Sequence, residues 1–333
     1  MFLLKVIKKM YYLFSKYRNI LIRILQDYSK YKRNPEKKRI NFKGWDCSLD
    51  LPWFKNFYFL DFFPNEYKER EISCYKPDVE FFTVFGDREM IKKSKAPIKI
   101  FWTGEDVQNN YTFFSDYCLS DSDLSIGFNP YINEKNYMRY PYWLLYYIKP
   151  DFSKDQIANF VKKINNARYE KTEFCSLIAS HNEFIRQDIY NLISQFAKIN
   201  CGGKLFHNDD CLKTDYADNK TEYLKKFMFN ICPENTNVDG YVTEKLFQAF
   251  AAGCIPIYNG GGNYLEPGII NPKAIVYYTK ENENDVLEQV KELWTNEKAY
   301  RDFISQKRLF DNSVDFIYDL NMKVRQKILE IVK

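Results

Sequence analysis

The sequence predicts an α/β protein with two nucleotide-binding-type halves, each built on a parallel β-sheet that helices cover on both faces. Short apolar runs typical of buried strands alternate with amphipathic helical segments, most regularly in the second half of the chain. The length of 333 residues suits two domains of ordinary size. Hydrophobic residues make up 45% and charged residues 28% of the chain, a composition that excludes disordered and low-complexity proteins.

Residues 1–33 are expected to form a basic amphipathic helix. They contain nine Lys or Arg residues and a single acidic residue, Asp27. Such a helix binds an anionic membrane surface, so we expect a cytoplasmic protein with peripheral membrane association. A short coiled coil that pairs two copies, or a helix packed on its own domain, would give the same pattern. Apolar residues recur at alternating gaps of four and three, which places them on one helical face: Leu3, Ile7, Met10, Phe14, Tyr17, Leu21, Ile24 and Tyr28.

The first globular domain is expected at residues 41–155, after a charged linker that ends near residue 40. Within it, the run IKIFW at 98–102 reads as a strand whose exit loop begins Thr103-Gly104-Glu105. The polar, Lys-rich stretch 150–172 is interpreted as the connection between the domains. Two further apolar runs are predicted to be strands, at 81–85 and 123–128.

The second domain is expected at residues 156–333, where strands and helices alternate regularly. Parallel sheets bind ligands beyond the carboxyl ends of their strands, so functional residues are expected in the loops that follow the strands. Strands are predicted at 174–179, 227–232, 254–258 and 274–278, and helices at 183–197, 244–252 and 284–294.

Charge, cysteine and histidine usage exclude several classes of protein. The whole chain carries a net charge of +5, but the residues after 33 are net negative, which argues against a nucleic-acid-binding surface. The 8 cysteines are irregularly spaced without a C-x-x-C pair, which disfavours a zinc ribbon and favours a reducing compartment. The 2 histidines, His181 and His207, are too few for a three-histidine metal site.

The densest group of polar residues lies in segment 230–262, NICPENTNVDGYVTEKLFQAFAAGCIPIYNGGG. A predicted strand ends at the Pro-Glu-Asn turn 233–235, and Thr243 is placed to cap the next helix. The free N–H groups and positive dipole end of that helix favour an anion. Glu244 and Lys245 follow in the first turn, where a carboxylate accepts from sugar hydroxyls and an ammonium neutralises a phosphate. The structural alternative is a surface capping pattern with an ordinary charge pair.

This segment resembles the signature of the α-1,3/1,4-fucosyltransferase family, glycosyltransferases that use GDP-fucose. Its run ENTNVDGYVTEKLFQAFAAGCIPIYNG carries the family's E-N-[ST], Y-V-T-E-K and G-x-[IV]-P-[IV] elements. The resemblance covers roughly residues 75–280. Three other stretches match in the same order: IFWTGED at 100–106, DLSIGF and YMRYPYW within 123–143, and FCSLIASHNEFIRQDIYNLI at 174–193.

The resemblance implies a GT-B architecture: two Rossmann-like domains facing a cleft, with the donor on the C-terminal domain and the acceptor on the N-terminal one. It implies inverting transfer of L-fucose to a glycan hydroxyl, for example N-acetylglucosamine in a lactosamine-like oligosaccharide or in lipopolysaccharide, with an α-1,3 or α-1,4 linkage. Such transfer needs a base for the acceptor hydroxyl and positive groups for the leaving diphosphate. No cofactor beyond the donor substrate is expected, and dependence on a divalent metal stays open.

Glu105 is the candidate base, because it matches the Glu of the family's TGEN motif. The alternative is a carboxylate that binds acceptor hydroxyls without proton transfer. Asp106 stands where the family has Asn, and it is expected to make the loop more negative.

Five residues are candidate donor contacts by resemblance. Arg186 and Lys245 match the cations that hold the nucleotide diphosphate, and Glu244 matches the carboxylate that holds the ribose hydroxyls. Tyr241 matches the donor-contacting tyrosine before V-T-E-K. Asn235 is a sugar or phosphate contact or, equally, a residue that closes the loop.

Other interpretations stay open at this stage. The chain could use a different nucleotide sugar, or be a catalytically silent, membrane-associated glycan-binding protein, and a homodimer is not excluded. The D-x-D sequence at 121–123 precedes a strand on the acceptor side and is interpreted as a cap or turn rather than a metal motif. Residues 208–210 read as a polar turn, and glycines 260–262 as a loop that is either flexible or close to the donor. No metal site and no nucleic-acid partner are expected.

Overall fold

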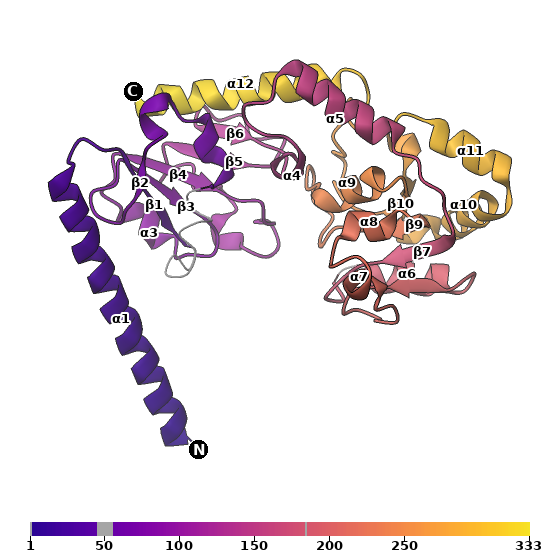
Figure 1. Cartoon of the computed structure of the whole chain (residues 1–333), viewed down its shortest axis with the longest axis horizontal. Coiled ribbons are helices and arrows are strands. Elements are labelled where there is room, and N and C mark those ends of the chain that lie inside the picture. The colour runs from indigo at the N-terminus through magenta and orange to yellow at the C-terminus, as the bar shows by residue number, and fades with distance from the viewer. Residues whose placement is uncertain (1, 45–55, 184) are drawn as a thin grey trace. The chain divides into compact units, whose positions relative to one another are not determined.

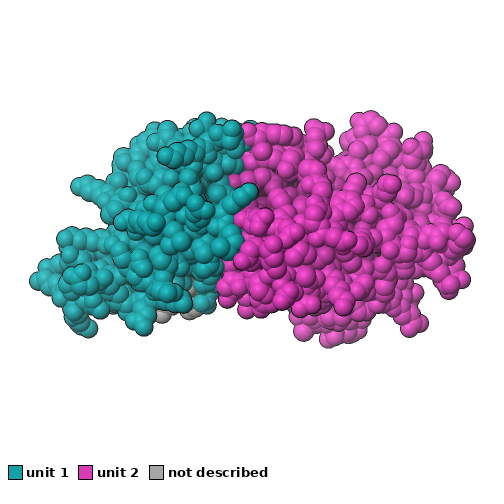
Figure 2. Space-filling model, turned by 90° about the horizontal axis from the view of Figure 1, so that it is seen from above, with its two compact units in different colours: residues 1–127, 132–138, 321–333 teal, residues 128–131, 139–320 magenta. Residues whose placement is uncertain are grey.

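The computed structural model describes residues 2–44, 56–183 and 185–333, with side chains described from residue 18 onward. The chain forms two compact units, which Figure 2 shows in different colours. Unit 1 contains residues 1–127, 132–138 and 321–333, and unit 2 contains residues 128–131 and 139–320. The last turns of the C-terminal helix belong to unit 1, whereas the sequence predicts that the whole C-terminal region lies in the second domain.

Unit 1 is built on a six-stranded sheet with the order β2-β1-β3-β4-β5-β6 (Figure 1). The neighbours β2/β1, β1/β3, β3/β4 and β4/β5 are parallel, as the sequence predicts. Its strands are β1 (Arg39–Lys43), β2 (Glu71–Ile72), β3 (Val79–Phe82), β4 (Ile98–Trp102), β5 (Leu124–Gly127) and β6 (Tyr137–Arg139). Its short helices are η1 (Tyr58–Phe62), η2 (Asn65–Tyr67), α3 (Glu89–Lys92) and η3 (Thr112–Phe114).

Unit 2 is built on a five-stranded sheet with the order β11-β10-β9-β7-β8, in which all four pairs are parallel. The strands are β7 (Glu173–Leu177), β8 (Ile199–Cys201), β9 (Phe227–Ile231), β10 (Ile255–Tyr258) and β11 (Val276–Tyr277). The chain adds β8 on one side of β7 and then returns to add β9 on the other. Such a reversal leaves a crevice at the carboxyl ends of the two strands, which is where open α/β sheets bind ligands.

The helices of unit 2 connect its strands and cover the sheet (Figure 1). The predicted helices near 183–197, 244–252 and 284–294 are confirmed as α6, α9 and α10. The full set is α4 (Leu144–Tyr147), α5 (Lys154–Asn166), α6 (Arg186–Ser194), α7 (Cys211–Thr214), α8 (Lys220–Leu224), α9 (Glu244–Ala251), η4 (Pro272–Ala274), η5 (Lys280–Asn282), α10 (Glu283–Thr295) and α11 (Glu297–Ser305), followed by α12 (Ser313–Val332), which continues into unit 1.

Two polar stretches that were expected to be irregular form regular structure. The charged linker ends in strand β1, where Arg39 is buried and its guanidinium donates to the carbonyl oxygens of Asn34, Pro35 and Lys37. The stretch 150–172 was expected to be a connection but contains helix α5. Its N-terminus is a capping box between Ser153 and Gln156, a pattern that the sequence does show. Burial of a narrow apolar stripe stabilises α5 despite its polar composition: Ile157, Val161 and Ile164.

Helix α1 (Phe2–Arg33) is one continuous helix, as predicted. Its second half contacts the segment that follows β2 in unit 1, because Asp27 is buried and accepts a hydrogen bond from the backbone N–H of Cys74 at 2.9 Å. Tyr28 and Tyr31 pack edge-on against Tyr75. No helix of the described residues is long and apolar enough to cross a membrane. Several apolar side chains of this half are nevertheless exposed: Ile20, Leu21, Ile22, Ile24 and Leu25.

Helix α9 is held in place by aromatic stacking within unit 2. The ring of Phe247 stacks on that of Trp143 with 4.0 Å between centroids, and both side chains are fully buried. Helix α9 begins with the candidate site residues Glu244 and Lys245. The stacking of Phe247 on Trp143 therefore positions these two residues as well as filling the core.

We expect Phe247→Ala to lower the free energy of unfolding by roughly 3–5 kcal/mol, since it removes a buried ring and leaves a cavity beneath Trp143. Urea unfolding followed by tryptophan fluorescence measures the change. Phe310→Ala, at a partly exposed position of the same unit, is the control and should cost much less. A loss below 1 kcal/mol for Phe247→Ala would contradict the proposed packing.

Candidate active site

A pocket lies at the carboxyl ends of β7 and β9, the place where the strand order of unit 2 reverses. Among its polar lining residues are Arg186, Asn230 and Lys245, which come from α6, β9 and α9. The Oδ1 atom of Asn230 is buried and has no hydrogen-bond partner in the described part of the chain, so one lining residue carries an unsatisfied acceptor. The apolar wall is formed by Leu177, Ile178, Ala179, Leu224, Ile231, Cys232 and Pro233.

Arg186 is the first residue of α6 and is almost completely buried. Its Nη1 donates to the carbonyl oxygen of His181 at 2.9 Å, and its Nη2 donates to Oδ1 of Asn235 at 2.5 Å. Burial lowers the pKa of the guanidinium. A buried arginine favours an anionic partner. These two hydrogen bonds fix the orientation of the Arg186 guanidinium at the pocket.

Lys245 is held by a carboxylate that the sequence analysis assigned no role. Glu234 is completely buried, and its Oε2 lies 2.9 Å from Nζ of Lys245. Three more donors reach the same carboxylate: the N–H of Thr243 at 2.8 Å, its hydroxyl at 2.6 Å and the hydroxyl of Tyr258 at 3.0 Å. Burial lowers the pKa of Lys245, but the charges of Glu234 and Glu244 outweigh it and raise the pKa overall. Lys245 is therefore a fixed, protonated cation.

The role expected for Thr243 is only half correct. It occupies the N-cap position of α9, but its side chain makes no capping hydrogen bond. Its hydroxyl donates to Glu234 and accepts from Lys245 at 3.0 Å. The consequence is that the first N–H groups of α9 donate no hydrogen bond to this side chain, which leaves a helix N-terminus suited to an anion next to Lys245.

The other three predicted donor contacts lie in the same region of unit 2. Asn235 is bonded to Arg186, as described above, which gives it the loop-fixing role that the sequence analysis left open. Glu244 is the first residue of α9, with its Oε1 4.0 Å from Nζ of Lys245. Tyr241 is buried, with its ring edge-on to Phe128 at 5.1 Å between centroids.

Glycines 260–262 form a fixed turn. The carbonyl oxygen of Gly261 accepts from the N–H of Gly240, and the N–H of Gly262 donates to Oδ1 of Asn237 at 2.7 Å. Gly262 has a φ of +56°, and a Cβ atom there would lie 2.0 Å from Oδ1 of Asp239. These bonds join the loop after β10 to the loop after β9, so the glycines are needed for a close backbone approach.

Glu105 lies in unit 1, in the loop after β4. Its N–H donates to Oγ1 of Thr103 at 2.9 Å, which fixes the start of the loop. Asp106, which was expected to make the loop more negative, is buried and also organises the loop. Its Oδ1 accepts from the N–H groups of Gln108 and Asn109 at 2.8 and 3.1 Å, and its Oδ2 accepts from the amide of Asn109.

The acidic segments 121–123 and 208–210 have structural roles, as their predicted turn or cap positions indicated. Asp121 forms an ion pair with Arg88 at 3.1 Å, and Asp123 accepts from the N–H of Lys99 at 2.7 Å. Asp209 accepts from the hydroxyl of Tyr223 at 2.7 Å. Within the described ranges, no group of three or more His, Cys, Asp or Glu side chains is arranged to hold a metal ion.

Comparisons with known proteins agree with this arrangement. The model of glycosyltransferase family 10 (fucosyltransferase), C-terminal part, matches residues 168–326, and that of the alpha-(1,3)-fucosyltransferase FucT N-terminal domain matches residues 52–146. The chain is 27% identical to the alpha-(1,3)-fucosyltransferase FucT of Helicobacter pylori, over 90% of this chain and 66% of that protein. It is 30% identical to the putative fucosyltransferase R654 of Acanthamoeba polyphaga mimivirus, over 44% of this chain and 26% of that protein.

Solved structures show the same fold. A crystal structure of an alpha1,3-fucosyltransferase superposes with a TM-score of 0.61 at 22% identity, covering 88% of this chain and 92% of that one. A crystal structure of alpha1,3-fucosyltransferase with GDP-fucose superposes with a TM-score of 0.58 at 22% identity, covering 87% and 90%. These matches confirm the predicted α/β fold class, the GT-B type of these glycosyltransferases.

The chain belongs to the fucosyltransferase family, as the motifs in its sequence indicated. It spans just under two thirds of the length of the Helicobacter pylori relative and about a quarter of that of the mimivirus relative.

Proposed function

We propose that the protein transfers L-fucose from GDP-fucose to a hydroxyl of a glycan acceptor, with inversion at the anomeric carbon. The observation that carries the proposal is the pair of cations Arg186 and Lys245 at one pocket, beyond the strand ends of unit 2 and beside the N-terminus of α9. Two fixed cations and a helix N-terminus suit the diphosphate of a nucleotide sugar, whose negative charge grows as the sugar leaves. Glu105 serves as the base for the acceptor hydroxyl.

The acceptor we propose is N-acetylglucosamine in a lactosamine-like unit, joined in α-1,3 or α-1,4 linkage. The relative from Helicobacter pylori, named an alpha-(1,3)-fucosyltransferase, supports the 1,3 linkage. Incubation with GDP-fucose and a set of lactosamine acceptors, followed by mass spectrometry and NMR of the product, tests donor, acceptor and linkage together. A parallel panel of other nucleotide sugars tests the rival donor, and absence of transfer from every donor would favour a silent glycan-binding protein.

We also propose that the protein is cytoplasmic and that α1 attaches it to anionic membranes. The support is its strong positive charge and the row of exposed apolar side chains Ile20, Leu21 and Leu25. Each basic residue near an anionic leaflet contributes about 1 kcal/mol, and the effect is screened by salt. Because Asp27 and Tyr28 also bind unit 1, the second half of the helix serves the fold as well.

We expect the full chain with four lysines of α1 replaced by glutamine to bind vesicles of anionic lipid far more weakly than wild type, by about a hundredfold or more. This design keeps the Asp27 contact that a truncation at residue 34 would remove. Fucose transfer to a soluble acceptor should be unchanged. Vesicle flotation at low and high salt measures binding, and sedimentation measures mass. If the substitutions change the mass instead of vesicle binding, α1 pairs two copies. The replaced residues are Lys5, Lys8, Lys9 and Lys16.

A further inference from the structure

Exposed aromatic side chains gather beyond the carboxyl ends of β3 and β4 in unit 1. Phe85 follows β3 and is 53% exposed, and Phe113 lies in the loop after β4 and is 83% exposed. Tyr111, in the same loop, packs its ring edge-on to that of Phe85 with 5.8 Å between centroids. Exposed apolar side chains that cluster in this way mark binding sites more often than isolated ones do.

This location is the point at which the strand order of unit 1 reverses. The sheet grows from β1 to β2 on one side and then to β3 and β4 on the other, so the order reverses between β1 and β3. The loops at that reversal pack backbone against backbone, since a Cβ atom on Gly86 would lie 2.6 Å from Cα of Gly44. Phe85 directly precedes this contact, so it lies at the sheet end and strand-order reversal where open α/β sheets bind ligands.

The loop that carries Tyr111 and Phe113 also carries Glu105, and it is folded tightly. The N–H of Tyr111 donates to the carbonyl oxygen of Asp106 at 3.2 Å. Burial and, to a smaller extent, the negative charge of Glu105 raise the pKa of Tyr111. The aromatic rings and the candidate base therefore belong to one compact structure.

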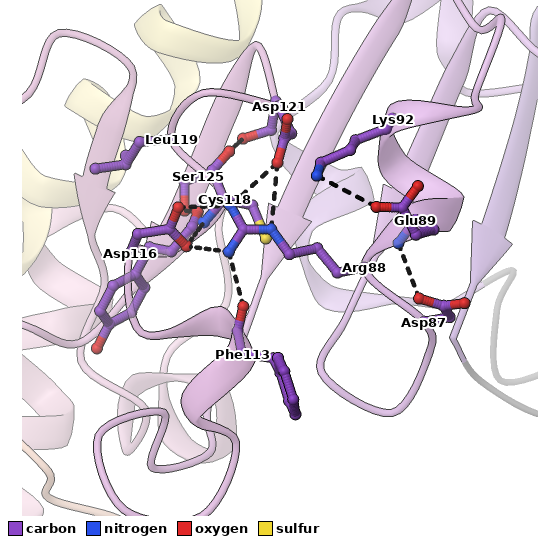
Figure 3. A network of polar contacts seen from close by, with 12 residues as sticks. Asp87, Arg88, Glu89, Lys92, Phe113, Asp116, Cys118, Leu119, Asp121 and Ser125 are labelled. Carbon is purple, nitrogen blue, oxygen red and sulfur yellow. Dashed lines mark hydrogen bonds and ion pairs between the residues drawn. The ribbon is translucent and has the colours of Figure 1, made fainter.

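Arg88 fixes the far end of this loop (Figure 3). Its Nη1 donates to the carbonyl oxygen of Phe113 at 2.7 Å, and its guanidinium forms ion pairs with Asp116 at 2.5 Å and Asp121 at 3.1 Å. The ring of Phe113 points away from this network (Figure 3). An exposed ring on an anchored backbone loses little conformational entropy on binding, which suits a recognition surface.

We propose that Phe85, Tyr111 and Phe113 form an acceptor platform, on which the C–H face of a pyranose ring of the glycan acceptor packs beside Glu105. This inference rests on the proposed function and names the acceptor-binding residues. A sugar ring has an apolar face of C–H groups and a rim of hydroxyls, which matches aromatic rings flanked by a carboxylate and a phenol. The negative charge of Glu105 disfavours an anionic membrane or a phosphate at this place, and the nearby Arg88 is already paired with Asp116 and Asp121.

The test compares Phe113→Ala and Phe85→Ala with wild type in the full chain, with N-acetyllactosamine as acceptor. Each variant should raise the acceptor KM roughly tenfold and leave the KM for GDP-fucose within a factor of two. Phe113→Tyr keeps the ring and should behave as wild type. Phe310→Ala, in unit 2, is the control for losing a partly exposed phenylalanine and should change neither constant. Saturation-transfer NMR with N-acetyllactosamine and GDP gives a reading that does not need turnover, and its signal should fall in Phe113→Ala.

The outcomes separate this inference from the proposed function. An acceptor KM within a factor of two of wild type in the Phe85→Ala/Phe113→Ala double variant overturns the platform while leaving fucose transfer intact. The same holds if the double variant changes the sedimentation mass and not the KM, because the surface would then join two copies of the chain. If wild type transfers no fucose, the proposed function fails, and the NMR comparison still decides whether the platform binds the sugar.

Discussion

Replacing Glu105 with glutamine should lower the turnover number for fucose transfer by roughly 10²–10⁴ while leaving GDP affinity unchanged. The amide has nearly the same shape as the carboxylate but cannot accept the proton of the acceptor hydroxyl. GDP affinity should be preserved because Glu105 lies in unit 1, whereas the candidate diphosphate contacts lie in unit 2. Steady-state kinetics and calorimetry on the same preparation measure the two effects.

The control for this experiment is Glu134→Gln, which makes the same chemical change at an exposed position of unit 1 and should leave turnover unaffected. The pH profile adds a second criterion. If Glu105 is the base, the acidic limb of the wild-type profile should be absent from the residual activity of Glu105→Gln. Turnover near the wild-type rate in a folded variant would assign Glu105 to acceptor binding.

Removal of the Arg186 side chain should weaken GDP binding tenfold or more. Charge-assisted hydrogen bonds contribute roughly 1.5–3 kcal/mol, and 1.4 kcal/mol corresponds to a factor of ten in affinity. Arg186→Ala also frees Asn235, so part of the effect arises from a loosened loop. Calorimetry with GDP measures the loss, and Arg301→Ala, an exposed arginine of α11, is the control. Wild-type affinity in Arg186→Ala would remove this residue from the site.

The matching change at Lys245 has a second consequence, because it leaves the buried carboxylate of Glu234 without its cation. We expect Lys245→Ala to weaken GDP binding at least tenfold and also to lower stability by roughly 1–3 kcal/mol. The double variant Glu234→Gln/Lys245→Met removes both charges and should recover stability but not GDP affinity. Recovery of affinity together with stability would mean that Lys245 acts on the fold alone.

The parts of this protein that could be predicted from its sequence are those that local patterns specify. The strand Ile98–Trp102 was predicted with its observed bounds, and the alternation of strands and helices gave the correct fold class. Segments stabilised by tertiary contacts were missed. At the start of strand β1, the N–H of Arg39 donates to Oδ2 of Asp78, which lies 39 residues further along the chain, and α5 buries only three apolar residues of a polar stretch.

The same division applies to the site. The motifs indicated Arg186 and Lys245 as candidate donor contacts. The side chains that hold these two cations in place come from other elements of the fold, so the motifs did not indicate these contacts. Glu234 accepts hydrogen bonds from residues on both α9 and β10, a convergence that no spacing in the sequence shows. The structural role of Asp106 was not predicted for the same reason, because its burial follows from how the whole loop folds.

Helix α12 has a consequence for the order in which the chain folds during synthesis. Its last turns, residues 321–333, belong to unit 1 and bury Val324 and Ile328 completely. Domains usually fold in the order in which the ribosome makes them. Residues 321–333 are made only after the whole of Arg139–Leu320, so unit 1 stays incomplete while unit 2 is translated. During this time, the apolar surface that Val324 and Ile328 pack against is uncovered. Chaperone binding to nascent chains should therefore concentrate on the unit that is translated first.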